Sequence, residues 1–254
     1  SIVDKLSIYD LLGEFSSTKE MLKWISKLNK QQTKNILSLN IDRERIKFDT
    51  KLLIDENQLN TDDYLNRVNA IASIDNAEGY EHLFENLVTP EFLKSEKFYK
   101  DIETLKRADC AQKPLWIIGK PDFINSPYHD EDFELIVEVK DSYTADALTE
   151  VATNIHSINS PYHQEDMLLI SKADTEVISS EYSGVGLMCL ATNEDSLKDK
   201  YHLENMHILA EHTSANEELF YIMTDNKFIK GKNYRKEVET LKNAKSRTNA
   251  RVLY

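Results

Sequence analysis

The chain has 254 residues and 41% of them are hydrophobic, enough for a substantial core in one large or two small domains. Lys and Arg number 31 against 44 Asp and Glu, a formal net charge of −13. No run approaches the roughly 18 apolar residues of a membrane span. Cys110 and Cys189 are too few for a disulfide framework and indicate the cytoplasm or another reducing compartment. A first residue of Ser rather than Met leaves a removed export signal open.

Charge is divided unevenly along the chain. Residues 1–52 carry ten basic and seven acidic residues, a net charge of +3. Residues 53–226 carry twelve and thirty-five, a net charge of −23, and residues 227–254 carry nine and two, a net charge of +7. Phosphate neutralisation supplies most non-specific affinity for nucleic acid, so the acidic middle argues against a protein that holds long duplexes unaided. The basic C-terminal segment 227–254 is expected either to supply that contact or to be a solvated helix end or linker.

The first 108 residues are predicted to be helical. Apolar residues recur at helical spacing in two stretches, Met21, Leu22, Ile25 and Leu28, and Tyr64, Leu65, Val68, Ile71 and Ala72. Thr61, followed by Asp62 and Asp63, suits the start of the second of these helices. Two further helices are predicted at 78–87 and 90–108, ahead of the first strand.

Residues 109–226 are predicted to alternate strands and helices, an α+β or α/β domain with a mixed central sheet flanked by helices. From Phe133 to Lys140 most side chains are apolar on both faces, which is typical of an interior strand. A helix is expected over 145–158. Further strands are predicted at 115–118, 166–170, 185–191, 206–210 and 219–223.

A short internal repeat lies in the same region. Residues 124–132 (Ile-Asn-Ser-Pro-Tyr-His-Asp-Glu-Asp) recur as residues 158–166, with eight of nine positions identical. Ser-Pro-Tyr favours a turn, so one interpretation is a loop-to-strand connection that is used twice. The alternative places His129, His163 and the neighbouring acids around one opening. Two copies are too few for a solenoid.

Two acids and a lysine flank the predicted interior strand. Asp122 follows the apolar run 115–118, and Glu138-Val139-Lys140 ends the strand. Side chains two residues apart on a strand point the same way, so Glu138 and Lys140 are expected on one face. A carboxylate in such a strand needs compensation, which a bound cation provides. This arrangement of Pro-Asp, spacer and Glu-x-Lys resembles the PD-(D/E)XK nuclease superfamily over residues 78–170.

The resemblance implies a restriction-endonuclease-like fold, with the first core helix beginning near residue 78, and hydrolysis of phosphodiester bonds in DNA or RNA. Asp122 and Glu138 would hold one or two Mg²⁺ or Mn²⁺ ions, hard cations that prefer oxygen ligands. The metal would activate a water molecule, and Lys140 would orient that water or stabilise the transition state. Many family members add a Glu from the preceding helix, for which Glu81 is the first candidate and Glu85 the second.

Other interpretations of these residues remain open. Glu138 and Lys140 also suit a cross-strand ion pair on an exposed sheet, and Glu81 a solvated helix face. His202, His207 and His212, spaced by five residues, fit ordinary positions better than a zinc site.

Three functions follow from the sequence. The favoured one is a metal-dependent nuclease, with the basic C-terminal segment as its candidate contact with nucleic acid. The second is an inactive nuclease-like fold whose acidic surface binds a basic protein partner. The third is a helical scaffold fragment of a larger protein.

Overall fold

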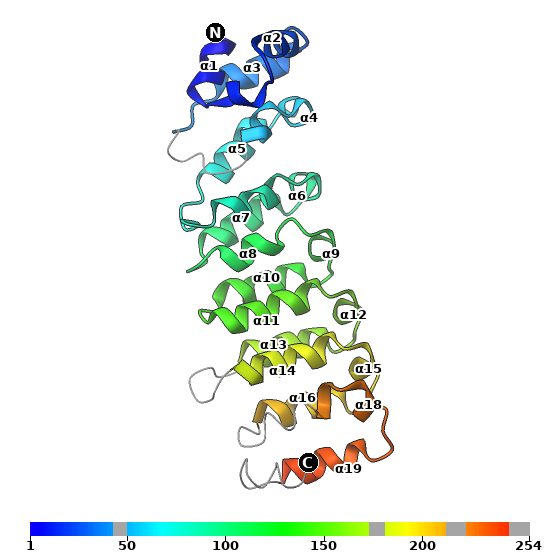
Figure 1. Ribbon diagram of the computed structural model, residues 1–254. Helices are drawn as coiled ribbons and strands as arrows, with labels where there is room; N and C mark the ends of the chain where they lie inside the picture. Colours follow the sequence, from blue (N-terminus) through cyan, green and yellow to red (C-terminus); the bar gives the residue numbers. More distant parts are fainter. Residues whose placement is uncertain (43–49, 173–180, 212–221, 244–254) are drawn as a thin grey trace. The chain divides into compact units, whose positions relative to one another are not determined.

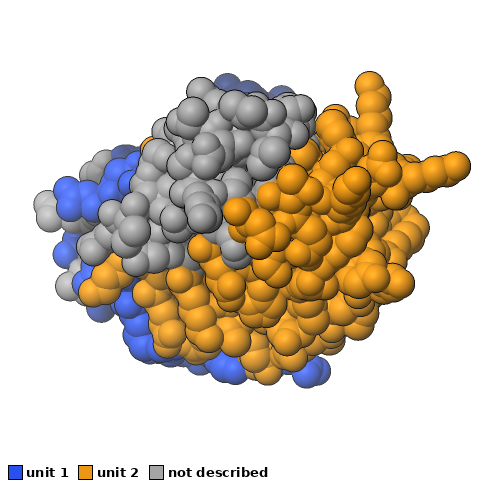
Figure 2. Space-filling view, turned by 90° about the horizontal axis from the view of Figure 1, so that it is seen from below, with its two compact units in different colours: residues 1–119 blue, residues 120–254 orange. Residues whose placement is uncertain are grey.

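The protein folds into two compact units of helices. The computed structural model describes residues 1–42, 50–172, 181–211 and 222–243. Contacts divide the chain into unit 1, Ser1–Gly119, and unit 2, Lys120–Tyr254 (Figure 2). Every regular element in the described residues is a helix, so the predicted mixed sheet and restriction-endonuclease-like fold are wrong. None of the described helices is long and apolar enough to cross a membrane.

Unit 1 consists of short α-helices and 3₁₀-helices (η). Its elements are α1 (Ile2–Ile8), η1 (Leu11–Glu14), α2 (Thr18–Ile25), α3 (Lys30–Ser38), η3 (Thr50–Ile54), α4 (Glu56–Leu59), α5 (Tyr64–Ala72), η4 (Glu81–Val88), α6 (Pro90–Lys94), α7 (Phe98–Lys106) and α8 (Gln112–Ile117). Ser1 and Asn29 form capping boxes that satisfy free N–H groups at the starts of α1 and α3. The unit ends at Gly119, where a Cβ atom would lie 2.5 Å from the Asn86 carbonyl oxygen, so only glycine allows this close approach.

Unit 2 repeats one order of elements. Its helices are α9 (Pro121–Ile124), α10 (His129–Glu138), α11 (Ser142–Thr153), α12 (Ile155–Ile158), α13 (His163–Ser171), α14 (Glu181–Thr192), α15 (Glu194–Leu197), α16 (His202–Glu211), α18 (Asn226–Ile229) and α19 (Tyr234–Lys242). Each repeat begins with a one-turn helix (α9, α12, α15 or α18), and a short turn leads into a first long helix (α10, α13, α16 or α19). A second long helix, α11 or α14, completes the first two repeats.

The equivalent helices of successive repeats pack beside one another. Figure 1 shows the one-turn helices following one another along one side of unit 2, with α10 and α11 stacked on α13 and α14. Each repeat therefore buries its apolar surface against its neighbours, which is how repeat proteins build a continuous core.

Most of the segment predicted as an interior strand, residues 133–138, belongs to helix α10, and residues 139 and 140 follow the helix. Phe133, Ile136 and Val137 are buried, while Glu138 is exposed. The spacing of three and four residues places the three apolar side chains on one helical face. Three acids in the first turn also favour a helix start, because they interact favourably with the positive end of the helix dipole.

The other predicted strands are also helical wherever they are described. Residues 115–118 belong mainly to α8, 166–170 to α13, 185–191 to α14 and 206–210 to α16. Of the segment 219–223, residues 219–221 lie outside the described residues, and 222 and 223 are helical. The helix expected over 145–158 is present as two helices, α11 and α12, which meet at Asn154.

Candidate functional site

The structure places the predicted nuclease residues at separate points of unit 2. Asp122 is exposed in α9, Glu138 is exposed at the end of α10, and Lys140 is exposed just after it. The His129 Nδ1–H donates to the Phe123 carbonyl oxygen at 3.1 Å, which holds α9 against the N-terminal end of α10. Asp122 and Glu138 thus lie toward opposite ends of a helix about 14 Å long. They are not brought together on one strand face.

Glu81, the third predicted metal ligand, is half-buried in η4 of unit 1. Among the residues that the structure describes, no group of three or more His, Cys, Asp and Glu side chains is arranged to hold a metal ion. The Mg²⁺ or Mn²⁺ site therefore stays a prediction, without support from the described geometry.

A Ser-His-Asp arrangement occurs instead between the first two repeats of unit 2. The His163 Nε2–H donates to Asp132 Oδ2 at 2.9 Å, and the Ser157 Oγ lies 3.0 Å from His163 Nδ1. A carboxylate only accepts hydrogen bonds, so Nε2 carries the proton and the Nδ1 of a neutral ring accepts from the Ser157 hydroxyl. Asp132 is in α10, whereas His163 begins α13, so the contact joins two repeats.

The same arrangement recurs between the next two repeats. The His202 Nε2–H donates to Asp166 Oδ2 at 2.9 Å, and the Ser196 Oγ lies 3.1 Å from His202 Nδ1. A third contact has the same register with different residues: the Asn205 Nδ2–H donates to the Tyr234 hydroxyl at 3.1 Å. We call the three contacts, Asp132–His163, Asp166–His202 and Asn205–Tyr234, the inter-repeat bridges.

Ring contacts accompany the bridges. The Tyr128 ring stacks on His163 with centroids 4.7 Å apart, and the Tyr162 ring stacks on His202 at 4.9 Å. At the third bridge the Arg235 guanidinium lies over the Tyr201 ring, 4.6 Å from its centroid. Each ring fixes the orientation of the group in the next repeat.

The Ser-His-Asp groups have the connectivity of a nucleophilic triad but lack access to a substrate. Ser157 and His163 are 0% exposed and Asp132 is 1% exposed. A nucleophilic hydroxyl must meet the reacting carbon at about 3 Å, which a fully buried oxygen does not do in this conformation. The arrangement is also repeated along the array and replaced by Asn and Tyr in the third bridge. It is therefore a structural connection between repeats.

Burial sets the protonation behaviour of the two carboxyl groups in the bridges. It raises the pKa of both Asp132 and Asp166 above the ordinary value, because a charge is costly in an apolar surrounding. The hydrogen bonds from His163 and His202 oppose part of this effect.

The bridges have a signal in the sequence, a His-x-x-Asp spacing that the predicted strands and nuclease motif do not include. His129-x-x-Asp132 and His163-x-x-Asp166 share one spacing, and His202-x-x-Asn205 continues it in a third copy whose turn differs. Of the histidines weighed for zinc, His202 is thus buried in a bridge, His207 is exposed on α16, and His212 lies outside the described residues.

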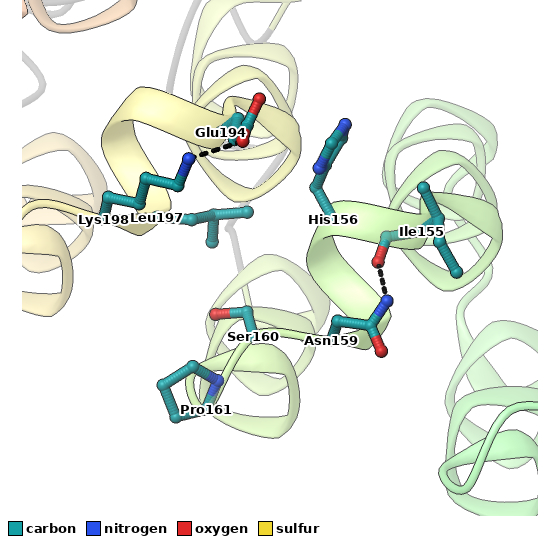
Figure 3. A pocket seen from close by; sticks show the side chains of 8 residues that line it. All are labelled: Ile155, His156, Asn159, Ser160, Pro161, Glu194, Leu197 and Lys198. Atoms are coloured by element: carbon teal, nitrogen blue, oxygen red, sulfur yellow. Dashed lines mark hydrogen bonds and ion pairs between the residues drawn. The ribbon is translucent and has the colours of Figure 1, made fainter.

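An open pocket of about 400 Å³ lies between the one-turn helices α12 and α15. Figure 3 shows the ring of His156 on α12 opposite the Glu194–Lys198 ion pair on α15, with the Leu197 side chain below the ion pair. The remaining lining residues are Ile155, Asn159, Ser160 and Pro161. Lys198 holds the pKa of the Glu194 carboxyl below its ordinary value, and the nearby His156 adds to this effect.

These features define unit 2 as an α-helical repeat array with buried polar bridges between repeats and a pocket on the side of its one-turn helices. Comparisons of the chain with protein-family models, with curated proteins and with solved structures found no match.

Proposed function

We propose that this chain is a helical-repeat scaffold that binds a basic segment of another polypeptide along the first long helices of unit 2. One observation carries the proposal. Glu131 on α10, Glu165 on α13 and Glu204 on α16 occupy the same repeat position, two residues after the histidine, and all three are exposed. Adjacent packed helices lie about 10 Å apart, so these acids form a row with a regular spacing.

Arg235 illustrates how the row takes a cation. Its guanidinium forms ion pairs with Glu204 and Glu239, and it lies over the ring of Tyr201. Planar guanidinium groups suit both carboxylate pairing and aromatic stacking. An arginine of a partner would find carboxylates in the same register at Glu131 and Glu165.

The charge of the chain favours a basic polypeptide over nucleic acid as the partner. Residues 53–226 carry a net charge of −23, which repels phosphate and attracts Lys and Arg. The basic C-terminal segment is partly used within the unit, because Lys230 pairs with Asp195 at 2.8 Å and Arg235 pairs with Glu204.

The proposal is tested by fluorescence anisotropy with three labelled probes: oligo-arginine, oligo-glutamate and random double-stranded DNA. We expect saturable binding of oligo-arginine alone, weakening as salt is raised from low to physiological concentration. The Glu131→Gln/Glu165→Gln variant should bind oligo-arginine about fivefold more weakly, since an exposed ion pair contributes about 0.5 kcal/mol.

Glu150→Gln is the matched control. Glu150 is exposed on α11, a second long helix, so its substitution removes one charge away from the row and should leave binding nearly unchanged. A loss of binding free energy in the control that is half the loss in the double variant would show that only total charge matters, because the control removes one charge and the double variant removes two. Cleavage of DNA or RNA with Mg²⁺ or Mn²⁺ that disappears in Lys140→Ala would overturn the proposal in favour of the nuclease.

A further inference from the structure

The pocket between α12 and α15 is explained by comparison with the next junction of the array. Between α15 and α18, Asp195 and Lys230 form an ion pair at 2.8 Å that joins the two one-turn helices. Asp195 lies seven residues before His202, and Lys230 lies four residues before Tyr234, the equivalent position in the next repeat.

At the junction that holds the pocket, the same two positions are His156 and Lys198. His156 lies seven residues before His163, and Lys198 lies four residues before His202. Two basic side chains cannot form the ion pair that joins α15 to α18. Lys198 instead pairs with Glu194 on its own helix, and the space between α12 and α15 stays open (Figure 3).

The pocket combines these basic groups with apolar surface. Ile155 is 50% exposed, and Leu197 and Pro161 also line the space. An isoleucine side chain that is half exposed in the free chain gains stability when a ligand removes it from water.

We propose that this pocket binds an acidic side chain of a partner polypeptide, with the carboxylate placed between His156 and Lys198 and flanking apolar residues against Ile155 and Leu197. The carboxylate would take the place that Asp195 takes at the next junction. The inference rests on the proposed scaffold function, because it assumes that the ligand is a polypeptide. The pocket is a surface separate from the row of Glu131, Glu165 and Glu204.

The rearrangement that such a ligand requires costs little. The side chains of Lys198 and Glu194 are 69% and 55% exposed, and exposed pairs four residues apart on a helix are weak. Lys198 and His156 both lower the pKa of Glu194, so the two basic groups already act together on one carboxylate at the edge of the pocket. A ligand carboxylate in the pocket would be attracted by the same two basic groups, Lys198 and His156.

The test is an NMR titration of the full chain that follows the ring signals of His156, assigned by their loss in a His156→Asp variant. The probes are the blocked peptide Ac-Leu-Asp-Leu-NH₂, its Asn counterpart and inorganic phosphate, at constant ionic strength. We expect a saturable shift with the Asp peptide and none with the Asn peptide or with phosphate. Lys198→Ala should weaken binding of the Asp peptide roughly tenfold, since it removes a charge-assisted hydrogen bond.

Two variants act on the junction itself. In His156→Asp the new carboxylate should pair with Lys198 as Asp195 pairs with Lys230, which should close the pocket and raise the melting temperature; peptide binding, followed by the backbone signals of Leu197, should be lost. Lys200→Ala, which removes an exposed charge two residues from Lys198 but outside the pocket, should leave peptide binding unchanged.

The proposal is overturned if the Asp and Asn peptides shift His156 equally, if phosphate binds as well as the Asp peptide, or if Lys200→Ala weakens binding as much as Lys198→Ala. The Glu131→Gln/Glu165→Gln variant should leave the titration unchanged. Failure of oligo-arginine binding and failure of this titration therefore test different surfaces and are distinguishable.

Discussion

Asp132 depends on the protein for its hydrogen bonds, because only 1% of its surface meets solvent. His163 supplies a charge-assisted bond at 2.9 Å from the next repeat, and the histidine is itself fully buried. Each partner therefore loses a necessary hydrogen bond if the other is removed, and the loss is larger than for an exposed pair.

Asp132→Ala should lower the free energy of unfolding by about 3 kcal/mol, because it leaves the Nε2–H of His163 buried without its acceptor. Urea unfolding followed by circular dichroism measures this change. Glu131→Ala, the exposed neighbour on the same helix, is the control and should change stability by less than about 0.5 kcal/mol. Equal effects of the two substitutions would contradict a stabilising role for the bridge.

A pH dependence follows from the raised pKa of Asp132. The carboxyl holds its proton more tightly in the folded state than in the unfolded state, so its contribution to stability is fully present below the ordinary pKa near 3.8 and is lost as pH rises through the higher folded pKa. Asp132→Asn keeps an acceptor for His163 and cannot ionise. The free energy of unfolding of the wild type minus that of Asp132→Asn should therefore decrease as pH is raised above about 4.

Unfolding in urea at several pH values between 4 and 7 measures this difference. A difference that rises with pH would mean that the bond from His163 outweighs burial and keeps the carboxylate ionised in the folded state.

At the scale of elements, the one-turn helices depend on their caps. The Asn154 side chain accepts the N–H groups of His156 and Ser157 at 3.0 and 3.1 Å at the start of α12. A helix of four residues cannot satisfy its first N–H groups internally, so the cap determines whether the turn forms. Asn193 makes the same contacts at the start of α15.

Asn154→Ala should lower the free energy of unfolding by about 1 kcal/mol, the usual cost of removing a cap, whereas Asn154→Asp should retain most of the stability. Thermal unfolding of the two variants checks this. The Ala variant should also disturb the position of Ser157 against His163. If Ala and Asp cost the same, the side-chain oxygen is not what holds α12.

At the scale of the whole molecule, unit 2 is a set of similar repeats that each contact their neighbours. The stability of such an array is close to the sum of the stabilities of its repeats and of the interfaces between neighbouring repeats. Like charges at the same position of successive repeats therefore add an electrostatic repulsion at each interface. Glu131 and Glu165, about 10 Å apart if their helices pack in the usual way, repel by roughly 0.4 kcal/mol in water.

Removing this repulsion should be visible at low ionic strength. Both acids also lie in the first turn of their helices, where they interact favourably with the helix dipole, so the repulsion is isolated by a double-mutant cycle. Glu131→Gln/Glu165→Gln should be more stable than the sum of the two single variants predicts, by a few tenths of a kcal/mol at about 0.01 M salt, and this difference should vanish near 1 M, where the screening length is about 3 Å. Melting temperatures across a salt series measure it. A gain that persists at high salt would indicate local packing rather than charge repulsion.

Apolar periodicity predicts α2 and α5, whereas the helices predicted at 78–87 and 90–108 are the 3₁₀-helix η4 and the pair α6 and α7. The repeat of residues 124–132 at 158–166 is a turn that leads into α10 and α13, not into strands. The predicted strand from Phe133 to Lys140 fails for a physical reason. Its apolar residues fit both a two-sided strand and a helix that is buried on most of its circumference, and a short apolar run does not distinguish these. The predicted metal site depended on that strand. Without it, Asp122 and Glu138 lie toward opposite ends of α10, and Glu81 lies in η4 of unit 1.

The sequence by itself determined local features: the Ser-Pro-Tyr turns and the spacing of three residues between His163 and Asp166. Only the tertiary structure decided that His163 bonds to Asp132 of the preceding repeat rather than to an acid of its own helix, and that His156 lies opposite the Glu194–Lys198 ion pair at an open pocket. The reason is that both contacts join residues more than thirty positions apart, whose meeting depends on how one repeat stacks on the next.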